Sequence, residues 1–212
     1  MKLKLDLHVH SRYSGDSVNS FEEISRRCRD QGLDGYAVCD HDSIDGLSEA
    51  TEKSGDLVVV PGLEVTSRGA HILCLNPSEI VPSRLSIIET VERIHAQGAT
   101  AVLAHPYGIP RSFVKFREVK MASLDAIEVA NSAQIPFGLI MSWNRGLSLR
   151  LSLPQTGGSD SHFPSTVGRS YTIIDSESRD PVDVIKAIRE GRTEVVGAGT
   201  RLGERLKQLS GL

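Results

Sequence analysis

Six of the seven histidines in this chain fall in short motifs that are rich in histidine and acidic residues. The motifs are DLHVHS at 6–11, CDHD at 39–42, GLEV at 62–65, HIL at 71–73, AHP at 104–106 and GSDSH at 158–162. Neutral imidazoles and carboxylates together are the ligand set for zinc, manganese and iron. Because most of the motifs follow a short apolar run typical of a β-strand, the sequence predicts a scaffold that gathers several strand ends around a cluster of metal ions.

The first motif indicates how a strand would position two ligands. Apolar residues from Leu3 to Val9 alternate with polar ones, which is the period of a strand. Side chains two residues apart in a strand share a face, so His8 and His10 point the same way and can chelate one ion. The remaining histidine, His95, lies near the C-terminal end of a predicted helix, where the dipole favours a cation, and we interpret it as structural.

Length and charge limit the classes of protein that fit. At 212 residues the chain suits a single domain over 1–212, with a core at about 3–200 and a short C-terminal tail at 201–212. The formal net charge of −3 argues against a broad nucleic-acid surface, so we do not expect extended nucleic acid as a partner. A small phosphorylated substrate stays open, since bound metal would supply positive charge locally.

The cysteines and the N-terminus point to an intracellular protein. Cys28, Cys39 and Cys74 are odd in number and lack a CxxC spacing, so we interpret them as buried free thiols. The N-terminus has no uninterrupted apolar segment, and no stretch approaches the ~18 apolar residues of a membrane span. We expect a cytoplasmic location and no membrane partner; the oligomeric state is open.

Strands and helices are predicted to alternate along the whole chain. The pattern indicates strands at 3–9, 36–39, 57–60, 71–75, 101–104, 126–130 and 172–174. It indicates helices from Ser20 to Gly32, at 46–54, 84–97 and 137–149, from Asp180 to Gly191, and in the tail from 201. Such alternation implies an α/β fold with a parallel sheet, either doubly wound or closed as a barrel. The motifs follow nearly every strand rather than one switch point, which favours a barrel, shorter than the usual eight-stranded one.

Five motifs in register resemble those of a known family. HVHS, CDHDS, PGLEV, AHPYG and GSDSH, in this order, resemble the PHP (polymerase and histidinol phosphatase) family of metal-dependent phosphoesterases, over about residues 4–200. The resemblance implies a distorted (β/α)7 TIM-like barrel with the metal site at the C-terminal ends of the strands. It also implies two or three divalent ions (zinc, manganese or iron) and hydrolysis of phosphomonoesters.

The resemblance assigns ligands position by position. His8 and His10 would share one ion with Glu64 and Asp160, and these four residues would hold the metal-bound hydroxide that attacks phosphorus. The charge of a bridging carboxylate such as Glu64 would offset the repulsion between adjacent cations.

A second and a third ion complete the implied set. The bridging glutamate would reach a second ion held by His71 and His105. A third ion would take His41, His162 and an acidic residue from the loop after HVHS. The family commonly reads YSDG in that loop, whereas this chain reads YSGD at 13–16. Asp16 is therefore displaced by one position, and occupancy of the third site depends on whether it reaches.

Three polar residues near the motifs each have both functional and structural interpretations. Asp40 and Asp42 flank the histidine of CDHD and could either orient ligand imidazoles or cap the turn. Asn131 ends the predicted strand AIEVAN, where it could contact substrate, act as a ligand or cap the strand.

Substrate recognition is predicted from basic residues near the motifs. A guanidinium offers a bidentate fork for phosphate, and the candidate contacts are Arg12, Arg111, Arg117 and Arg169. Phe113 or Phe116 in the same loop could stack on a ring. The alternative is a solvated basic segment with two core phenylalanines.

We consider three classes of function. The leading hypothesis is a phosphatase acting on nucleotide-like or related small phosphomonoesters, with histidinol phosphate as one alternative. A second is an exonuclease or phosphodiesterase acting on short oligonucleotides. A third is a metal-binding accessory domain without activity, which the full set of costly polar residues opposes.

Overall fold

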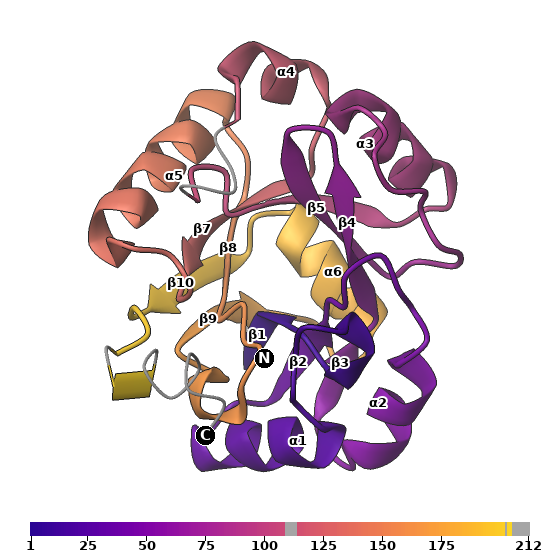
Figure 1. The fold of residues 1–212 in the computed structure, drawn as a ribbon, viewed down its shortest axis with the longest axis vertical. Helices are drawn as coiled ribbons and strands as arrows, with labels where there is room; N and C mark the ends of the chain where they lie inside the picture. Colours follow the sequence, from indigo (N-terminus) through magenta and orange to yellow (C-terminus); the bar gives the residue numbers. More distant parts are fainter. Residues whose placement is uncertain (109–113, 202, 205–212) are drawn as a thin grey trace.

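Two mixed five-stranded sheets form the centre of the molecule, and helices lie around them (Figure 1). The computed structural model of the protein describes residues 1–108, 114–201 and 203–204. The first sheet has the order β10 (Thr193–Gly197), β9 (Ser170–Asp175), β1 (Lys2–Val9), β2 (Gly35–Val38) and β3 (Val58–Val60). The second has the order β4 (Gly62–Ser67), β5 (Ala70–Leu75), β6 (Thr100–Ala104), β7 (Ala126–Asn131) and β8 (Gln155–Gly158).

Three of the six α-helices in the described part of the chain begin at a residue whose side chain caps the helix. The six are α1 (Phe21–Asp30), α2 (Leu47–Lys53), α3 (Ile87–Ala96), α4 (Phe116–Met121), α5 (Phe137–Leu151) and α6 (Pro181–Arg189), with short 3-10 turns η1 (Arg12–Ser14) and η2 (Pro164–Thr166). Ser20 and Glu23 form a capping box at the start of α1, and Ser86 and Glu89 form another at α3. The predicted helices are confirmed at these positions, and Asp180 caps α6 as expected.

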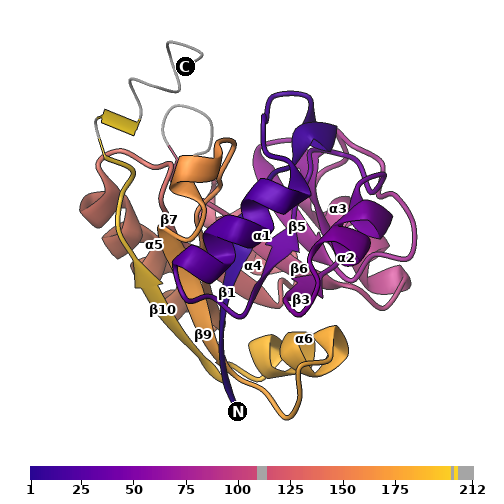
Figure 2. The same ribbon diagram turned by 90° about the horizontal axis from the view of Figure 1, so that it is seen from below.

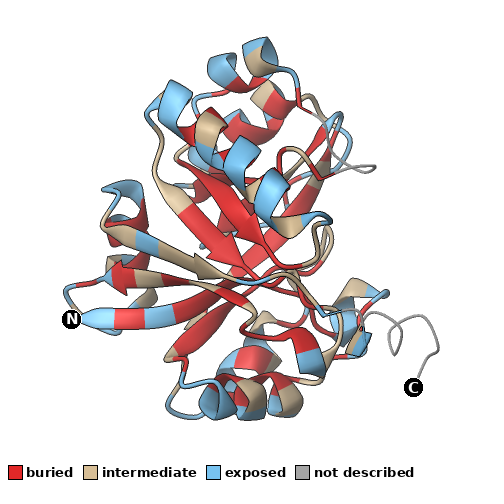
Figure 3. Ribbon diagram, turned by 90° about the vertical axis from the view of Figure 1, so that its left-hand side faces the viewer, coloured by how far each residue is buried: buried red, intermediate tan, exposed pale blue. Residues whose placement is uncertain are grey.

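Apolar side chains hold the layers together. One buried group packs the inner faces of both sheets against α6, and includes Leu5 of β1, Leu75 of β5 and Ile188 of α6. Two further groups pack α3, α4 and α5 on the second sheet, and α1 and α2 on the first. Most strands are accordingly buried, apart from β10 and the start of β1, while the helices alternate between buried and exposed residues (Figure 3). Figure 2 shows α6 on the same side as the N-terminus of β1, so the carboxyl end of β1 lies on the opposite side.

The prediction of a purely parallel sheet is wrong. The pairs β1–β9, β9–β10, β4–β5 and β5–β6 are antiparallel, whereas β1–β2, β2–β3, β6–β7 and β7–β8 are parallel. A short turn through Gly69, whose φ of 94° suits glycine, joins β4 directly to β5. A parallel connection would need a crossover of a dozen or more residues, so this turn makes the pair antiparallel.

Backbone pairing joins the sheets only locally. Among the described residues, isolated bridges pair His41 with Glu64 and Val9 with Ser161, and the strands form two sheets rather than one closed barrel. Both bridges fall within the histidine and acidic motifs. The motifs therefore lie where the two sheets meet.

Four elements were not predicted: β4, which is the GLEV motif itself, β8, β10 and α4. β8 has the sequence QTGG and no apolar run. A Cβ on Gly158 would lie 2.4 Å from Cβ of His8, so only glycine lets β8 approach β1 this closely.

Three further expectations have different outcomes. The predicted tail helix lies largely outside the described residues, since 202 and 205–212 are not described. In the described part of the chain, no helix has the length and apolar character needed to cross a membrane. The three cysteines are buried and free, as expected.

Candidate metal centre

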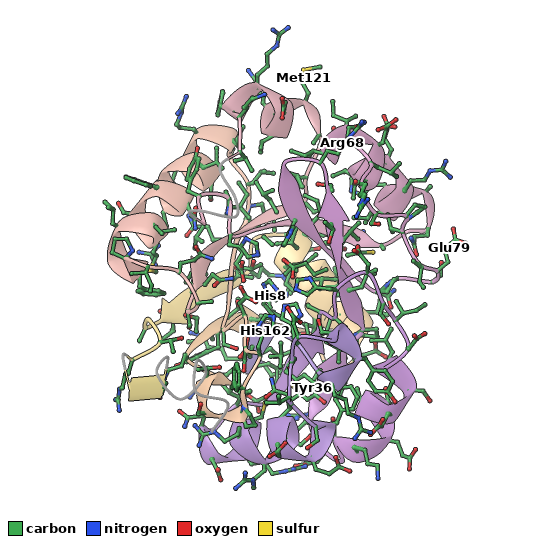
Figure 4. All side chains as sticks on the ribbon, in the orientation of Figure 1. His8, Tyr36, Arg68, Glu79, Met121 and His162 are labelled. Atoms are coloured by element: carbon green, nitrogen blue, oxygen red, sulfur yellow. The ribbon has the colours of Figure 1, made fainter. Side chains whose placement is uncertain are left out.

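The histidine and acidic motifs converge at the carboxyl end of β1. His8 and His162, far apart in the sequence, lie near each other at the centre of the molecule (Figure 4). All nine predicted ligands belong to one connected cluster of close nitrogen and oxygen atoms: His8, His10, Asp16, His41, Glu64, His71, His105, Asp160 and His162. The predicted convergence is therefore present in the structure.

The HxH pair lies fully buried at the end of β1. The Nε2 atoms of His8 and His10 are 3.1 Å apart, as expected for two side chains on one face of a strand. Oε2 of Glu64 lies 3.4 Å from Nε2 of His8 and 3.3 Å from Nε2 of His10. Three potential ligand atoms from both sheets thus surround one point.

Glu64 divides its two oxygens between groups of imidazoles. Oε1 accepts hydrogen bonds from Nδ1 of His71 at 2.8 Å and Nε2 of His105 at 2.9 Å. Oε2 also lies 3.1 Å from Nδ1 of His41, yet it is buried and has no hydrogen-bond partner in the described structure. A buried carboxylate oxygen without a hydrogen bond is unfavourable unless a cation satisfies it.

Asp160 faces the HxH pair from the loop after β8. Its Oδ1 lies 3.2 Å from Nε2 of His10, and its Oδ2 accepts a hydrogen bond from Nδ2 of Asn131 at 3.1 Å. The φ of Asp160 is 54°, a conformation that non-glycine residues rarely adopt and that is found at functional sites. Its N–H donates to the carbonyl of His8 at 2.8 Å, which holds this conformation in place.

Asp16 reaches the third group despite its displaced position. Its Oδ2 lies 3.5 Å from Nε2 of His41 and 3.3 Å from Nε2 of His162. The Asp16 side chain is half exposed, whereas the imidazoles of His8 and His10 are fully buried. This group therefore forms the solvent-facing edge of the cluster.

Opposite charges control the protonation of the cluster. Burial alone would raise the pKa of Glu64, but His8 and His10 outweigh it and hold this pKa well below its usual range. Burial alone would lower the pKa of His10, yet the nearby carboxylates of Asp160 and Glu64 raise it to about 9. Burial likewise opposes the ionisation of Asp16, and His162 overcomes it, lowering the Asp16 pKa to about 2. Without metal, the carboxylates thus stay ionised and favour the protonated forms of His8 and His10.

Glu128 is a site residue that the sequence analysis missed. It is buried on β7, where Oε1 accepts from Nδ1 of His8 at 2.9 Å and Oε2 accepts from the N–H of His105 at 2.8 Å. Nδ2 of Asn131 donates to the same Oε2 at 3.0 Å. A carboxylate at Nδ1 fixes the tautomer in which Nε2 is free to bind a metal. The signal was a glutamate in the middle of the apolar strand AIEVAN.

Asp6 is the second missed residue. Its carboxylate is buried and accepts hydrogen bonds from the N–H groups of Ser159 and Gly168, each at 2.8 Å. Burial raises the pKa of Asp6 to about 6, against these hydrogen bonds, which lower it. Asp6 therefore ties the loop that carries Asp160 to β1.

The two aspartates of the CDHD motif accept hydrogen bonds from backbone N–H groups. Asp40 accepts from the N–H and the hydroxyl of Ser11 at 2.6 and 2.7 Å, and Asp42 accepts from the N–H of Thr66 at 2.8 Å. Neither contact orients an imidazole, which agrees with the structural interpretation. Asn131 instead positions Asp160 and Glu128, and its own Oδ1 accepts from the N–H of Ala133.

The arginines predicted to contact phosphate lie in different surroundings. Arg12 pairs with Glu49 at 2.6 Å, and Arg169 pairs with Glu204. Arg117 is exposed on α4, and Arg111 lies outside the described residues, as does Phe113. Their role in binding substrate stays a prediction. His95, interpreted as structural, has its Nε2 2.9 Å from Oδ2 of Asp125.

Two family models match the chain. A model described as PHP domain matches residues 6–122, and one described as PHP-associated matches residues 145–193. The first match contains the HxH pair, Glu64, His71 and His105, and the second contains Asp160 and His162. Together they include the whole cluster.

Two known proteins are similar to this chain in sequence. Uncharacterized protein MJ1587 of Methanocaldococcus jannaschii is 33% identical, over 61% of this chain and 82% of that protein. A 5'-3' exoribonuclease of Haemophilus influenzae is 31% identical, over 53% of this chain and 44% of that enzyme.

A solved structure supports the fold. A two-domain protein from Bacteroides vulgatus, described as containing a predicted PHP-like metal-dependent phosphoesterase, superposes with a TM-score of 0.74 at 18% identity, over 99% of this chain and 70% of that one. From the cluster geometry, the fold and the match over more than half of its length, the chain belongs to the PHP domain family.

Proposed function

We propose that this protein hydrolyses the phosphomonoester bonds of small molecules at a centre of two or three divalent cations. At a coarser level it is a metal-dependent hydrolase that acts on phosphoester bonds, in keeping with its family and with relatives named as nucleases and phosphodiesterases. The observation that carries the proposal is the buried carboxylate of Glu64 surrounded by imidazoles of four motifs.

The residues of the cluster fit divalent cations. Oε2 of Glu64 is buried without a hydrogen bond, and three imidazole nitrogens lie within 3.4 Å of it. The donor set combines imidazole nitrogens with carboxylate oxygens, which suits zinc, manganese and iron. A cation would coordinate Oε2 of Glu64 and displace protons from the imidazole nitrogens around it.

Three groups of ligands are proposed. The first consists of His8, His10, Glu64 and Asp160. In the second, the same glutamate is joined by His71 and His105. The third consists of His41, His162 and Asp16, and it is the most exposed.

Bound cations would act as Lewis acids that polarise phosphate oxygens, lower the pKa of water and offset charge on the leaving oxygen. The residues of the chain prepare the place where this happens. Glu128 holds His8 with Nε2 directed into the cluster, and Asn131 turns Oδ1 of Asp160 toward His10. Such fixed positions reduce the reorganisation needed during reaction.

Small phosphomonoesters are the preferred substrate class, and the alternatives stay open. Histidinol phosphate would need the same chemistry. A short oligonucleotide is also compatible, since one relative is named as an exoribonuclease. A purely structural role is disfavoured because burying this many ionisable groups is costly without a bound ion. The three free thiols fit the proposed cytoplasmic location, where cysteines stay reduced.

A substrate screen tests the proposal. The purified protein, stripped by a chelator and reloaded with manganese, zinc or iron, is assayed on nitrophenyl phosphate, nucleoside monophosphates, histidinol phosphate and short oligonucleotides. We expect metal-dependent release of inorganic phosphate, abolished in His8→Ala and Glu64→Ala. Near-normal turnover by either variant would reject the scheme.

A further inference from the structure

The surface formed by α4 and α5 differs in charge from the rest of the molecule. The sides of the two helices that meet here, with the residue before α4, carry the basic residues Lys115, Arg117, Lys120 and Arg150, all exposed. The one acidic residue of the two helices, Glu118, pairs with Lys115. In the described part of the chain no ion pair involves the three arginine and lysine residues that remain. A chain with a net charge of −3 thus concentrates positive charge here, and we call this surface the basic face.

An aromatic pocket opens on the basic face. It has a volume of about 610 Å³, and its lining includes Tyr107, Phe116, Trp143, Leu147 and Arg150. The guanidinium of Arg150 lies 4.2 Å from the centroid of the Phe116 ring, and the rings of Tyr107 and Trp143 are 6.4 Å apart in an edge-on arrangement. Trp143 keeps 42% of its surface exposed, which is unusual for so large an apolar side chain.

The pocket is continuous with the metal centre along the chain. Tyr107 follows His105 by two residues, so their Cα atoms are at most about 7 Å apart. The N–H of Tyr107 donates to Oδ1 of Asn144 on α5 at 3.3 Å, which fixes this segment between the cluster and the pocket.

From this combination we infer that the basic face binds a single-stranded oligonucleotide, with one base in the pocket against Trp143 and backbone phosphates along the arginines and lysines. Aromatic rings with cations beside them suit stacked bases and an anionic backbone. The inference rests on the proposed function, and it favours the oligonucleotide that was left open there as the substrate of the same centre.

The positive charge of the basic face favours an anionic partner over a second copy of the chain. A two-fold contact through the basic face would place like charges opposite each other, which is costly. An anionic partner removes this cost. A simple anion such as phosphate would contact only the basic side chains, so its binding would not account for the exposed Trp143.

Binding to the full-length protein tests the inference. The probe is a short oligoadenylate with hydrolysis-resistant phosphorothioate linkages, so that the result does not depend on turnover. Trp143 is the only tryptophan of the chain, and its fluorescence therefore reports on the pocket alone. We expect saturable quenching that weakens with salt, with a slope of about −0.7 in log K per phosphate contacted.

Two variants and one control locate the contact. Anisotropy of a labelled probe should show a Kd about tenfold higher or more for Arg150→Glu and for Trp143→Ala. The matched control is Arg26→Glu on α1, an exposed arginine on another side of the molecule, which should bind like the wild type.

The outcomes distinguish the alternatives. Equal affinities for all variants would overturn the inference, and so would full competition by tripolyphosphate without a change in fluorescence. A dimer that Trp143→Ala converts to a monomer would show that a second copy covers the face instead. Hydrolysis by the wild type is measured separately, so retained binding without metal-dependent hydrolysis of any phosphoester in the substrate screen would reject the proposed function alone.

Discussion

The side chain of Glu64 sets the character of the centre because its two oxygens face different groups of imidazoles. Oε1 is hydrogen-bonded to His71 and His105, while Oε2 is buried near three other histidines without a hydrogen bond. Such a side chain can bridge two cations, whereas a carboxylate satisfied on both oxygens could not. The residues around it act by holding ligands in place.

Glu128→Gln tests this positioning. An amide can accept from His8 or from the backbone of His105, but its NH2 group must then face the other donor. We expect metal affinity to fall by about 10–100-fold. Competition with a chromophoric chelator measures the change, and Glu92→Gln on the exposed face of α3 is the matched control. Unchanged affinity in Glu128→Gln would show that His8 needs no carboxylate partner.

The raised pKa of His10 predicts how metal binding depends on pH. Carboxylates raise this pKa to about 9, so below that pH a proton occupies a nitrogen that the cation needs. The apparent affinity should increase as pH rises from 6 to 9, by up to about tenfold per unit for each proton displaced. Metal titrations at pH 6, 7.5 and 9, corrected for the pH dependence of the indicator, show whether the apparent affinity rises or falls. An affinity that is flat or falls over this range contradicts the assignment of His10.

Among the secondary-structure elements, β8 is the one on which the site most depends. It carries the loop of Asp160 and packs against β1 at Gly158, where there is no space for a side chain. Asp6 then ties the start of this loop to β1. The precise approach of two strands therefore positions ligands from distant motifs.

Gly158→Ala should destabilise the protein and weaken metal binding together. The added Cβ would lie 2.4 Å from Cβ of His8, so β8 or β1 must shift, at a cost of about 1–3 kcal/mol or more in the free energy of unfolding. Urea unfolding and metal titration measure the two effects. Gly138→Ala on α5, with no atom within 4 Å of its added Cβ, should leave both near the wild-type value. A stable, fully metal-binding Gly158→Ala would refute the packing argument.

The sequence predicted the elements with strong periodicity and missed those without it. Capping boxes at Ser20 and Ser86 and clear apolar faces made α1 and α3 predictable. β8 was missed because Gly158 is required by contact with a distant strand, which no local pattern reports. Among site residues, motif spacing identified the ligands, whereas Glu128 was hidden because a buried glutamate on a strand only makes sense beside His8.

At the level of the whole molecule, the cluster connects two sheets that few backbone bonds join. His8 belongs to the first sheet and His10 directly follows it, while Glu64 and His71 belong to the second. In the described chain, the backbone contacts at this boundary include the isolated bridges at His41 and Val9 and the N–H of Asp160, which donates to the carbonyl of His8. The barrel and the single domain over 1–212 stay predictions, but cations at this boundary would hold the sheets together.

Metal removal should therefore lower thermal stability. A ligand present at a thousand times its Kd stabilises the native state by about 4 kcal/mol, which corresponds to about 8–16 °C in Tm for a chain of this size. Calorimetry with and without a chelator measures the difference, and reloading should reverse it. A Tm that is the same with and without metal would mean that the cluster does not bridge the sheets.

The most direct test is the metal content of the purified protein, measured by mass spectrometry per mole of chain, for the wild type and Glu64→Gln. The account predicts two to three equivalents of zinc, manganese or iron in the wild type, and at least one fewer in the variant, whose bridging charge is gone. Less than about one tenth of an equivalent in a wild type that hydrolyses phosphoesters at full rate would contradict it.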